Sequence, residues 1–155
     1  MSVLRNLRLW LFPLRMADPD FGMLVFMYTS KRPERSYWEC EWTFPKTNTV
    51  VVIAIRGSER GPLPEARQFY LSLPGRFEQV LNACRPGLER VFNDWLHQPL
   101  PSDVFSLVTL SGFDLDDPNE QPVRWEVSFE TRGANWLGIT VPFVGDTAME
   151  ALVDT

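Results

Sequence analysis

The side chains in this sequence that could do chemistry are chiefly carboxylates spaced two or four residues apart. Glu39 and Glu41 fall in one segment of alternating polarity, and Glu126 and Glu130 fall in another. Successive side chains of a strand point to opposite faces, so each pair would project from a single face. Two facing carboxylates are the catalytic pair of a glycosidase, but nothing in the sequence indicates a cleft around either pair. Hydrolysis is therefore a minor hypothesis, and no catalytic residue is assigned.

A tighter acidic cluster consists of Asp114, Asp116, Asp117 and Glu120. Carboxylate oxygens of this kind can hold a calcium ion, but the cluster lacks the spacing and the glycine of a known calcium loop. Asp residues beside Pro118 are also typical of turns. We therefore expect a hairpin turn here, with no metal ion and no cofactor. The same four carboxylates are our candidate site for binding a basic partner.

The remaining reactive side chains offer little catalytic potential. His97 is the only histidine, and its place just before Pro99 favours a capping or cationic role at the end of a helix. Cys40 and Cys84 both fall in apolar stripes, which predicts reduced packing residues and fits a cytoplasmic location. The numbers of Cys and His exclude a Cys/His zinc site. No glycine is followed by the Lys-Ser/Thr pair of a phosphate-binding loop.

The formal net charge of −5 is distributed unevenly along the chain. Residues 1–100 hold thirteen Lys or Arg and ten Asp or Glu, whereas residues 101–155 hold two and ten. Such an acidic C-terminal third argues against nucleic acid as a partner and would suit a basic protein surface. The alternative is a solvated acidic surface that only keeps the protein soluble. With 45% apolar residues, the 155-residue chain is expected to form a single globular domain over residues 1–155.

Periodicity predicts a first group of strands in residues 18–56. Residues 37–44 alternate between apolar and polar side chains, as a half-buried strand does. Residues 49–55 form a β-branched run, which predicts a central strand covered on both faces. A strand before these two completes a three-stranded antiparallel meander. Four tryptophans fall on the apolar faces predicted here and further along the chain, and are expected in the core: Trp38, Trp42, Trp95 and Trp125.

The rest of the chain predicts helices and then a second group of strands. Residues 64–97 show helical periodicity, and the prolines within them suggest a kinked helix or two helices sharing one face. Residues 104–144 form a second three-stranded meander, in which Pro142 favours an edge position for the last strand. The tail from Gly145 suggests one weak helical turn. The predicted order β-β-β-α-α-β-β-β gives an α+β fold, with an antiparallel sheet and helices packed on one face.

The N-terminal segment, residues 1–17, is amphipathic. Leu4, Leu7, Trp10 and Leu11 fall at helical spacing, so we expect a short helical turn packed on the domain. The six-residue apolar run within the segment is too short for a signal peptide, and no stretch is long enough to span a membrane. A helix lying on a membrane surface is the alternative.

Several short motifs between residues 10 and 144 resemble a group of bacterial domains of unknown function. These domains open with D-P-x-F-G-x-L followed by a W-E strand, and some lie in gene neighbourhoods suggestive of toxin immunity. The resemblance implies this fold and an immunity-like role, but it supplies no catalytic residues. The matching motifs are Leu11-Phe12, Asp18-Pro19-x-Phe21-Gly22-x-Leu24, Tyr37-Trp38-Glu39 and Trp136-x-Gly138-x-x-Val141.

The leading functional hypothesis is a non-enzymatic, cytoplasmic protein-binding module of the immunity-like kind. Its acidic cluster would cover a basic, toxin-like protein surface. The alternative is a small-ligand-binding protein or a hydrolase with a site between sheet and helices. A third possibility is a structural subunit that forms a homodimer through the edge of the strand after Trp136.

Overall fold

The computed structural model describes the backbone of residues 3–155 and the side chains of residues 7–155. The helices in this part of the chain are α1 (Val3–Leu11) and α2 (Pro64–Val91), with single helical turns at Pro33–Arg35, Phe92–Leu96 and Val104–Ser106. The strands are β1 (Arg15–Asp18), β2 (Gly22–Met27), β3 (Tyr37–Phe44), β4 (Thr49–Ser58), β5 (Gly61–Pro62), β6 (Val108–Leu115), β7 (Arg124–Thr131), β8 (Gly138–Val144), β9 (Thr147–Ala148) and β10 (Leu152–Asp154).

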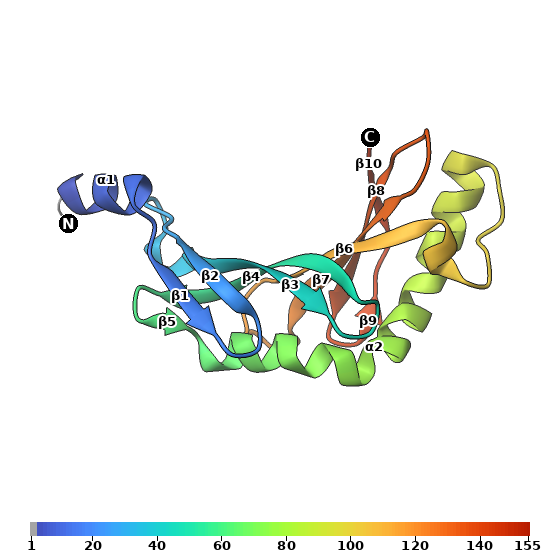
Figure 1. The fold of residues 1–155 in the computed structure, drawn as a ribbon. Helices are drawn as coiled ribbons and strands as arrows, with labels where there is room; N and C mark the ends of the chain where they lie inside the picture. Colours follow the sequence, from blue (N-terminus) through green and yellow to red (C-terminus); the bar gives the residue numbers. More distant parts are fainter. Residues whose placement is uncertain (1–2) are drawn as a thin grey trace.

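The strands form one sheet with α2 on one of its faces (Figure 1). Their order is β1-β2-β3-β4-β6-β7-β8-β10, with β5 added to β4 and β9 added to β8. All neighbouring strands are antiparallel except β4 and β6, which run parallel. A parallel pair needs a crossover connection, and α2 provides it. The predicted α+β class with a mostly antiparallel sheet is confirmed.

The predicted three-stranded meanders differ in detail from the observed strands. Residues 15–18 form β1, which pairs with β2 and makes the first group four-stranded. The tail, expected as a weak helical turn, instead forms β9 and β10 along β8. The expectation that β8 is an edge strand is therefore wrong, because β7 pairs with one side of it and β9 and β10 with the other.

The predicted helical segment is one long helix with two internal prolines. Pro74 and Pro86 each remove a backbone hydrogen bond, at a cost of about 3 kcal/mol in an ordinary helix interior. The apolar stripe nevertheless continues past both, and its burial against the sheet outweighs the prolines. The helix bends along its length in Figure 1, as expected for a proline-containing helix. The buried residues of α2 are Ala66, Tyr70, Leu73, Phe77, Val80, Cys84, Leu88 and Val91.

Tyr70 of α2 bonds to both strands of the parallel pair, β4 and β6, where the two strand groups meet. Its hydroxyl donates a hydrogen bond to the Ala54 carbonyl oxygen at 2.8 Å and accepts one from the Leu115 N–H at 3.0 Å. The ring is fully buried. One side chain thus ties β4, β6 and the helix together at the centre of the fold.

Three of the four tryptophans expected in the core are there. Trp38, Trp42 and Trp125 are 2%, 6% and 4% exposed. Trp95, which was also expected in the core, is 52% exposed, so that prediction is wrong. It follows the end of α2, in the wider π-helical turn Phe92–Leu96, which rotates the side chain away from the apolar stripe.

No described helix covers the second face of the sheet. The β-branched run in β4 was expected to be buried on both sides, but Val50 and Val52 are 56% and 48% exposed. Alternate residues Val51 and Ile53 are buried under α2. Strand β4 is therefore central in the sheet but open on one face, and we call this uncovered surface the open face.

Helix α1 stands away from the body at one end of the sheet (Figure 1). Leu9 reaches the core, whereas Leu7, Trp10 and Leu11 are exposed. The expectation that this apolar stripe packs on the domain is therefore wrong for these three residues, and Leu4, the fourth residue of the stripe, lies outside the described side chains. Among the described residues, no helix is both long and apolar enough to cross a lipid bilayer.

Candidate functional site

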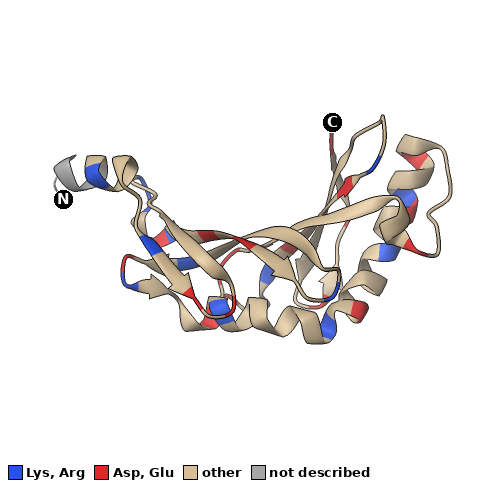
Figure 2. Ribbon diagram, in the orientation of Figure 1, with Lys and Arg blue, Asp and Glu red and all other residues tan. Residues whose placement is uncertain are grey.

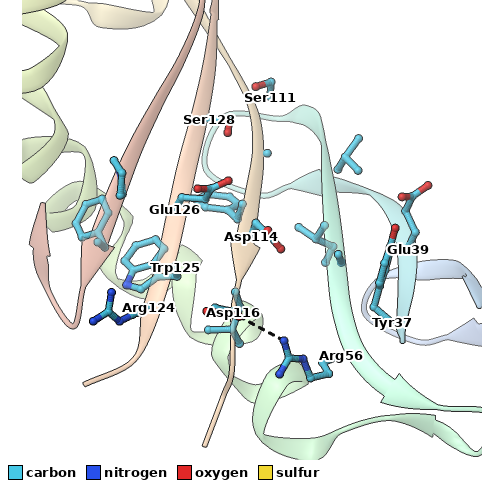
Figure 3. Close-up of a pocket in the computed structure, with 18 of the residues that line it drawn as sticks. Tyr37, Glu39, Arg56, Ser111, Asp114, Asp116, Arg124, Trp125, Glu126 and Ser128 are labelled. Atoms are coloured by element: carbon cyan, nitrogen blue, oxygen red, sulfur yellow. Dashed lines mark hydrogen bonds and ion pairs between the residues drawn. The ribbon is translucent and has the colours of Figure 1, made fainter. Parts of the chain in front are cut away.

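The open face carries a groove of about 920 Å³. Its lining residues come from β3, β4, β6, β7 and β8. Neighbouring strands lie about 4.8 Å apart, so the four steps from β3 to β8 span about 19 Å. Figure 3 shows side chains from these strands around the shared space. The groove is thus a broad surface feature across the middle of the sheet.

Three carboxylates lie in one row across the groove. The backbone register places Glu39 opposite Ala54, Ala54 beside Asp114, and Asp114 opposite Glu126. Beyond Glu126 the same row continues to Pro142. Residues paired in this way project from the same face, so the three carboxylates share the open face with no cation between them. In the other direction the row runs from Glu39 past Val25 to Arg15. We call Glu39, Asp114 and Glu126 the acidic row.

Two of the cations that line the groove form ion pairs with carboxylates outside the acidic row. Arg56 lies 3.4 Å from Asp116 and 3.5 Å from Asp117, measured from guanidinium nitrogen to carboxylate oxygen. Arg124 lies 3.9 Å from Glu120. Each of these pairs reaches solvent, so its net contribution to stability is about 0–1 kcal/mol. The pairs neutralise one end of the groove, and the charge of Arg56 also offsets part of the rise in the pKa of Asp114.

The structure separates the four residues of the predicted site. Asp114 projects into the groove, and Asp116 lines one end of it. Asp117 and Glu120 lie in the loop between β6 and β7, where Asp117 accepts a hydrogen bond from the Asn119 N–H at 2.9 Å. This contact is the turn chemistry expected from the sequence. Among the described residues, Asp114 is the one of the four with no ion pair.

The groove raises the pKa values of Asp114, Glu126 and Tyr37. For Asp114, burial of the carboxyl by the groove walls is the largest cause, and the nearby Asp116 adds to it, although Asp114 still reaches solvent. The pKa of Glu126 is raised by burial and then by the charge of Asp114. The pKa of Tyr37 is raised by burial, Glu39 and Asp114. Partial desolvation and mutual repulsion therefore both disfavour the charged forms of these groups.

Apolar side chains line the middle of the groove beside the acidic row. Val52 and Ala54 contribute from β4, and Pro142 and Val144 contribute from β8. Val52 is half exposed. An Arg or Lys side chain has an apolar stem and a charged tip, so this mixture of surfaces would accommodate both parts.

The sequence contained the signal for Glu39 and Glu126, because both stand at outward positions of alternating strands. The sequence analysis paired Glu39 with Glu41 and Glu126 with Glu130, because each pair lies on a single strand. In the structure Glu130 also lines the groove, whereas Glu41 does not. The relevant partner of both was Asp114, which lies opposite Glu126 through the antiparallel pairing of β6 with β7 and shares a row with Glu39 through the parallel pairing of β4 with β6.

The other reactive side chains lie away from the groove. His97 adopts a left-handed conformation (φ 53°) at the end of the helical turn Phe92–Leu96, which fits the expected terminal position. Cys40 and Cys84 are buried free thiols, as predicted, and burial raises the pKa of each to about 12. In the described part of the chain, no group of three or more His, Cys, Asp or Glu side chains could hold a metal ion.

The interface between sheet and helix, which the alternative hypothesis assigned to a ligand, is filled by packed rings. Phe77 of α2 lies 4.9 Å from Phe44 and 6.4 Å from Phe113, measured between ring centroids. All three rings are buried. The groove lies on the opposite face of the sheet.

The D-P-x-F-G motif forms a turn that is fastened to α2. The Asp18 carboxylate accepts hydrogen bonds from the Asp20 and Phe21 N–H groups at 2.8 and 3.1 Å. Arg67 of α2 donates to both oxygens of Asp18 at 3.0 Å and also pairs with Asp20. Burial acts to raise the pKa of Asp18, but the Arg67 and backbone donors outweigh it and hold that pKa below its usual value. The motif therefore has a structural role.

Comparison with known proteins gives no relative of this chain. A scan against protein-family models, a search of curated proteins and a search of solved structures each found no match.

Proposed function

We propose that this chain is a non-enzymatic protein-binding module whose open face receives a basic protein surface. The observation that carries the proposal is the acidic row, in which Glu39, Asp114 and Glu126 share one face with no cation among them. A partner that presents Arg or Lys would supply the missing positive charge. Complementary charge of this kind speeds encounter and selects the partner.

The energetic cost of the acidic row supports a binding role. Like charges directly opposite each other on antiparallel strands destabilise a sheet, by an amount comparable to the roughly 0.2–1 kcal/mol that a favourable cross-strand pair contributes. Asp114 and Glu126 are such a pair, and both also have raised pKa values. A surface selected only for stability and solubility would place a cation at one of these positions. A partner's cations would relieve the repulsion.

The size of the groove favours a protein partner over a small molecule. A span of about 19 Å across five strands exceeds the length of most metabolites. Protein interfaces typically bury about 800 Å² on each partner, with an apolar centre and a polar rim. The exposed Val50 and Val52 extend the apolar part of the open face beyond the acidic row. The open face therefore has the extent and the chemistry of such an interface.

The resemblance to bacterial immunity-like domains supports a narrower form of the proposal. In that form the partner is a basic, toxin-like protein, and the open face covers its functional surface. A cytoplasmic location belongs to the same proposal, because the buried thiols Cys40 and Cys84 are free.

A second candidate function, small-ligand binding or hydrolysis, is favoured by one observation in the same groove. Asp114 and Glu126 lie opposite each other and both have raised pKa values, as a catalytic carboxyl pair can. This function would place the site on the open face instead of between sheet and helix. It predicts that a small molecule alone, without a partner protein, slows hydrogen exchange of the backbone amides that line the groove.

Titration with a basic probe, followed by amide-resolved NMR, tests the proposed surface. The probe is a peptide of about ten residues that alternates Arg and Leu, as a stand-in for a basic and partly apolar surface. We expect shifts at Glu39, Asp114 and Glu126 that vanish at high salt. Glu78 and Glu89, exposed carboxylates on α2, provide the internal control. Equal shifts at the control positions would show non-specific charge attraction and contradict the proposal.

A further inference from the structure

A second surface lies at the end of the sheet where α1 joins β1, and it is unlike the open face. Four large apolar side chains are exposed there: Leu7, Trp10, Leu11 and Phe12. Trp10 and Phe12 are 79% and 72% exposed, although side chains of this kind usually dominate protein cores. Contiguous exposed apolar surface of this extent marks an interaction site.

The orientation of α1 explains this exposure. Positions three and four residues apart share one face of a helix, so Leu7, Trp10 and Leu11 form a single stripe. Leu9 lies on the opposite side of the helix and is the described α1 residue that reaches the core. Helix α1 is therefore attached to the domain by its narrower side, and its apolar stripe points to solvent.

Basic side chains surround this stripe. Strand pairing brings the start of β1, the loop from β2 to β3 and the turn from β4 to β5 to the same end of the sheet. Figure 2 shows Lys and Arg residues, in blue, along these segments. Helix α1 and these three segments hold six exposed cations against two carboxylates, Glu34 and Glu59, among the described side chains. We call these cations the basic end: Arg8, Arg15, Lys31, Arg32, Arg35 and Arg60.

We propose that the basic end and α1 together bind the surface of an anionic lipid membrane. Helix α1 would lie in the headgroup region with Leu7, Trp10 and Leu11 directed toward the acyl chains. Trp favours this interfacial depth because its ring is apolar and its N–H is polar. The arginines and Lys31 would remain among the lipid phosphates. The basic end makes this a peripheral attachment by the surface of the protein.

Charge complementarity favours a membrane as the occupant. Among the described side chains, helix α1 and the three segments around it carry an excess of four positive charges in a chain whose net charge is −5. An anionic surface would therefore attract this end and repel the acidic row, which fixes the orientation of the bound protein. Helix α1 protrudes from the body of the domain (Figure 1). A lipid surface can receive such a protruding helix without a complementary pocket.

Co-sedimentation with lipid vesicles tests the proposal. One set of vesicles is pure phosphatidylcholine, and the other contains about one quarter phosphatidylglycerol to supply negative charge. We expect the chain to sediment with the anionic vesicles and to be released by high salt. Trp10→Asp should lower the partition coefficient roughly tenfold or more, because it removes the largest apolar side chain of the stripe. Arg8→Gln should lower it about fivefold, the effect of one cation near an anionic surface.

Trp136→Asp is the matched control, because Trp136 is also half exposed but lies between β7 and β8, away from the basic end. This variant should bind vesicles like the unchanged chain. Equal binding to both vesicle types, or unchanged binding of Trp10→Asp, would overturn the proposal. So would a chain that ignores vesicles but doubles its mass through Trp10, since a second copy would then be the occupant. Circular dichroism of each variant confirms that the fold is retained.

Discussion

Asp114 lies directly opposite Glu126 across strands β6 and β7, on the face of the sheet that no described helix covers (Figure 3). The two carboxylates repel, and the charge of Asp114 adds to burial in raising the pKa of Glu126. Glu39 completes the row from β3 through the register of β4. The fold therefore holds negative charges together at the centre of an open surface, and a basic partner would stabilise that arrangement.

Neutralising one member of the pair should stabilise the protein alone. We expect Glu126→Gln to raise the free energy of unfolding by about 0.5 kcal/mol at neutral pH, because it removes a like-charge contact. Glu130→Gln is the control, since Glu130 lies opposite Thr109 and Gly138 and not opposite a carboxylate. Urea unfolding of both variants measures the difference. A Glu126→Gln variant that is less stable than wild type would contradict this account of the row.

The repulsion should also appear in the pH dependence of stability. The pKa values of Asp114 and Glu126 are raised above 3.8 and 4.5 in the folded protein, so the unfolded chain loses these protons first as pH rises. Their stabilising contribution is present below those values and is lost as pH rises through the folded pKa values. The double variant Asp114→Asn/Glu126→Gln lacks this loss.

Urea midpoints measured across the acidic range test that expectation. Wild type and the double variant should have similar stability at the lowest pH at which both fold, and the variant should gain an advantage toward neutral pH. An advantage for the variant that is constant at all pH values would assign the effect to packing rather than to charge.

Two tryptophans that look alike in the sequence should differ in their contribution to stability. Trp42 is 6% exposed, and its ring contacts Phe21 and Phe44 at centroid distances of 5.0 and 5.2 Å. Trp42→Ala should cost about 3–5 kcal/mol, as expected for a large aromatic core residue. Trp95→Ala should change stability by less than about 1 kcal/mol, because half of that side chain is already in water. Comparable urea midpoints for the two variants would be inconsistent with the burial described above.

The hydroxyl of Tyr70 should be worth more than its size suggests. Tyr70→Phe would remove the bond to the Ala54 carbonyl and leave the buried Leu115 N–H without its acceptor. An unsatisfied buried group costs about 1–3 kcal/mol. Tyr37→Phe, on the open face, is the matched control and should change stability by less than about 0.5 kcal/mol. Equal effects of the two substitutions on the urea midpoint would show that the hydrogen bonds of Tyr70 to β4 and β6 do not stabilise the fold.

Local pattern was sufficient to predict strand β3 and helix α2 with their inward faces. The alternation in residues 37–44 gave the bounds of β3, and it placed Trp38 and Trp42 in the core. The apolar stripe of residues 64–97 predicted α2 and its buried face. In each case the period of the element and the burial of its side chains agree, so short-range information decides the outcome.

The groove depended on information that local pattern does not contain. Asp114 and Glu126 share a row with Glu39 because β4 and β6 pair in parallel, with α2 as the crossover and Tyr70 bonded to both strands. The β-branched run of β4 predicts a strand equally well with one face covered or two, so the exposure of Val52 was missed. Trp95 was missed because its place depends on where α2 ends.

Capture of partners by the immobilised protein tests the central claim most directly. Wild type, the groove variant Asp114→Lys/Glu126→Lys and the control variant Glu78→Lys/Glu89→Lys are each exposed to lysate of the source cell at low and high salt. The two variants change the net charge equally, on opposite faces of the sheet. We predict that wild type and the control retain the same basic protein at low salt, that both lose it at high salt, and that the groove variant never retains it. Retention of that protein by the groove variant would contradict the assignment of the open face as the binding surface.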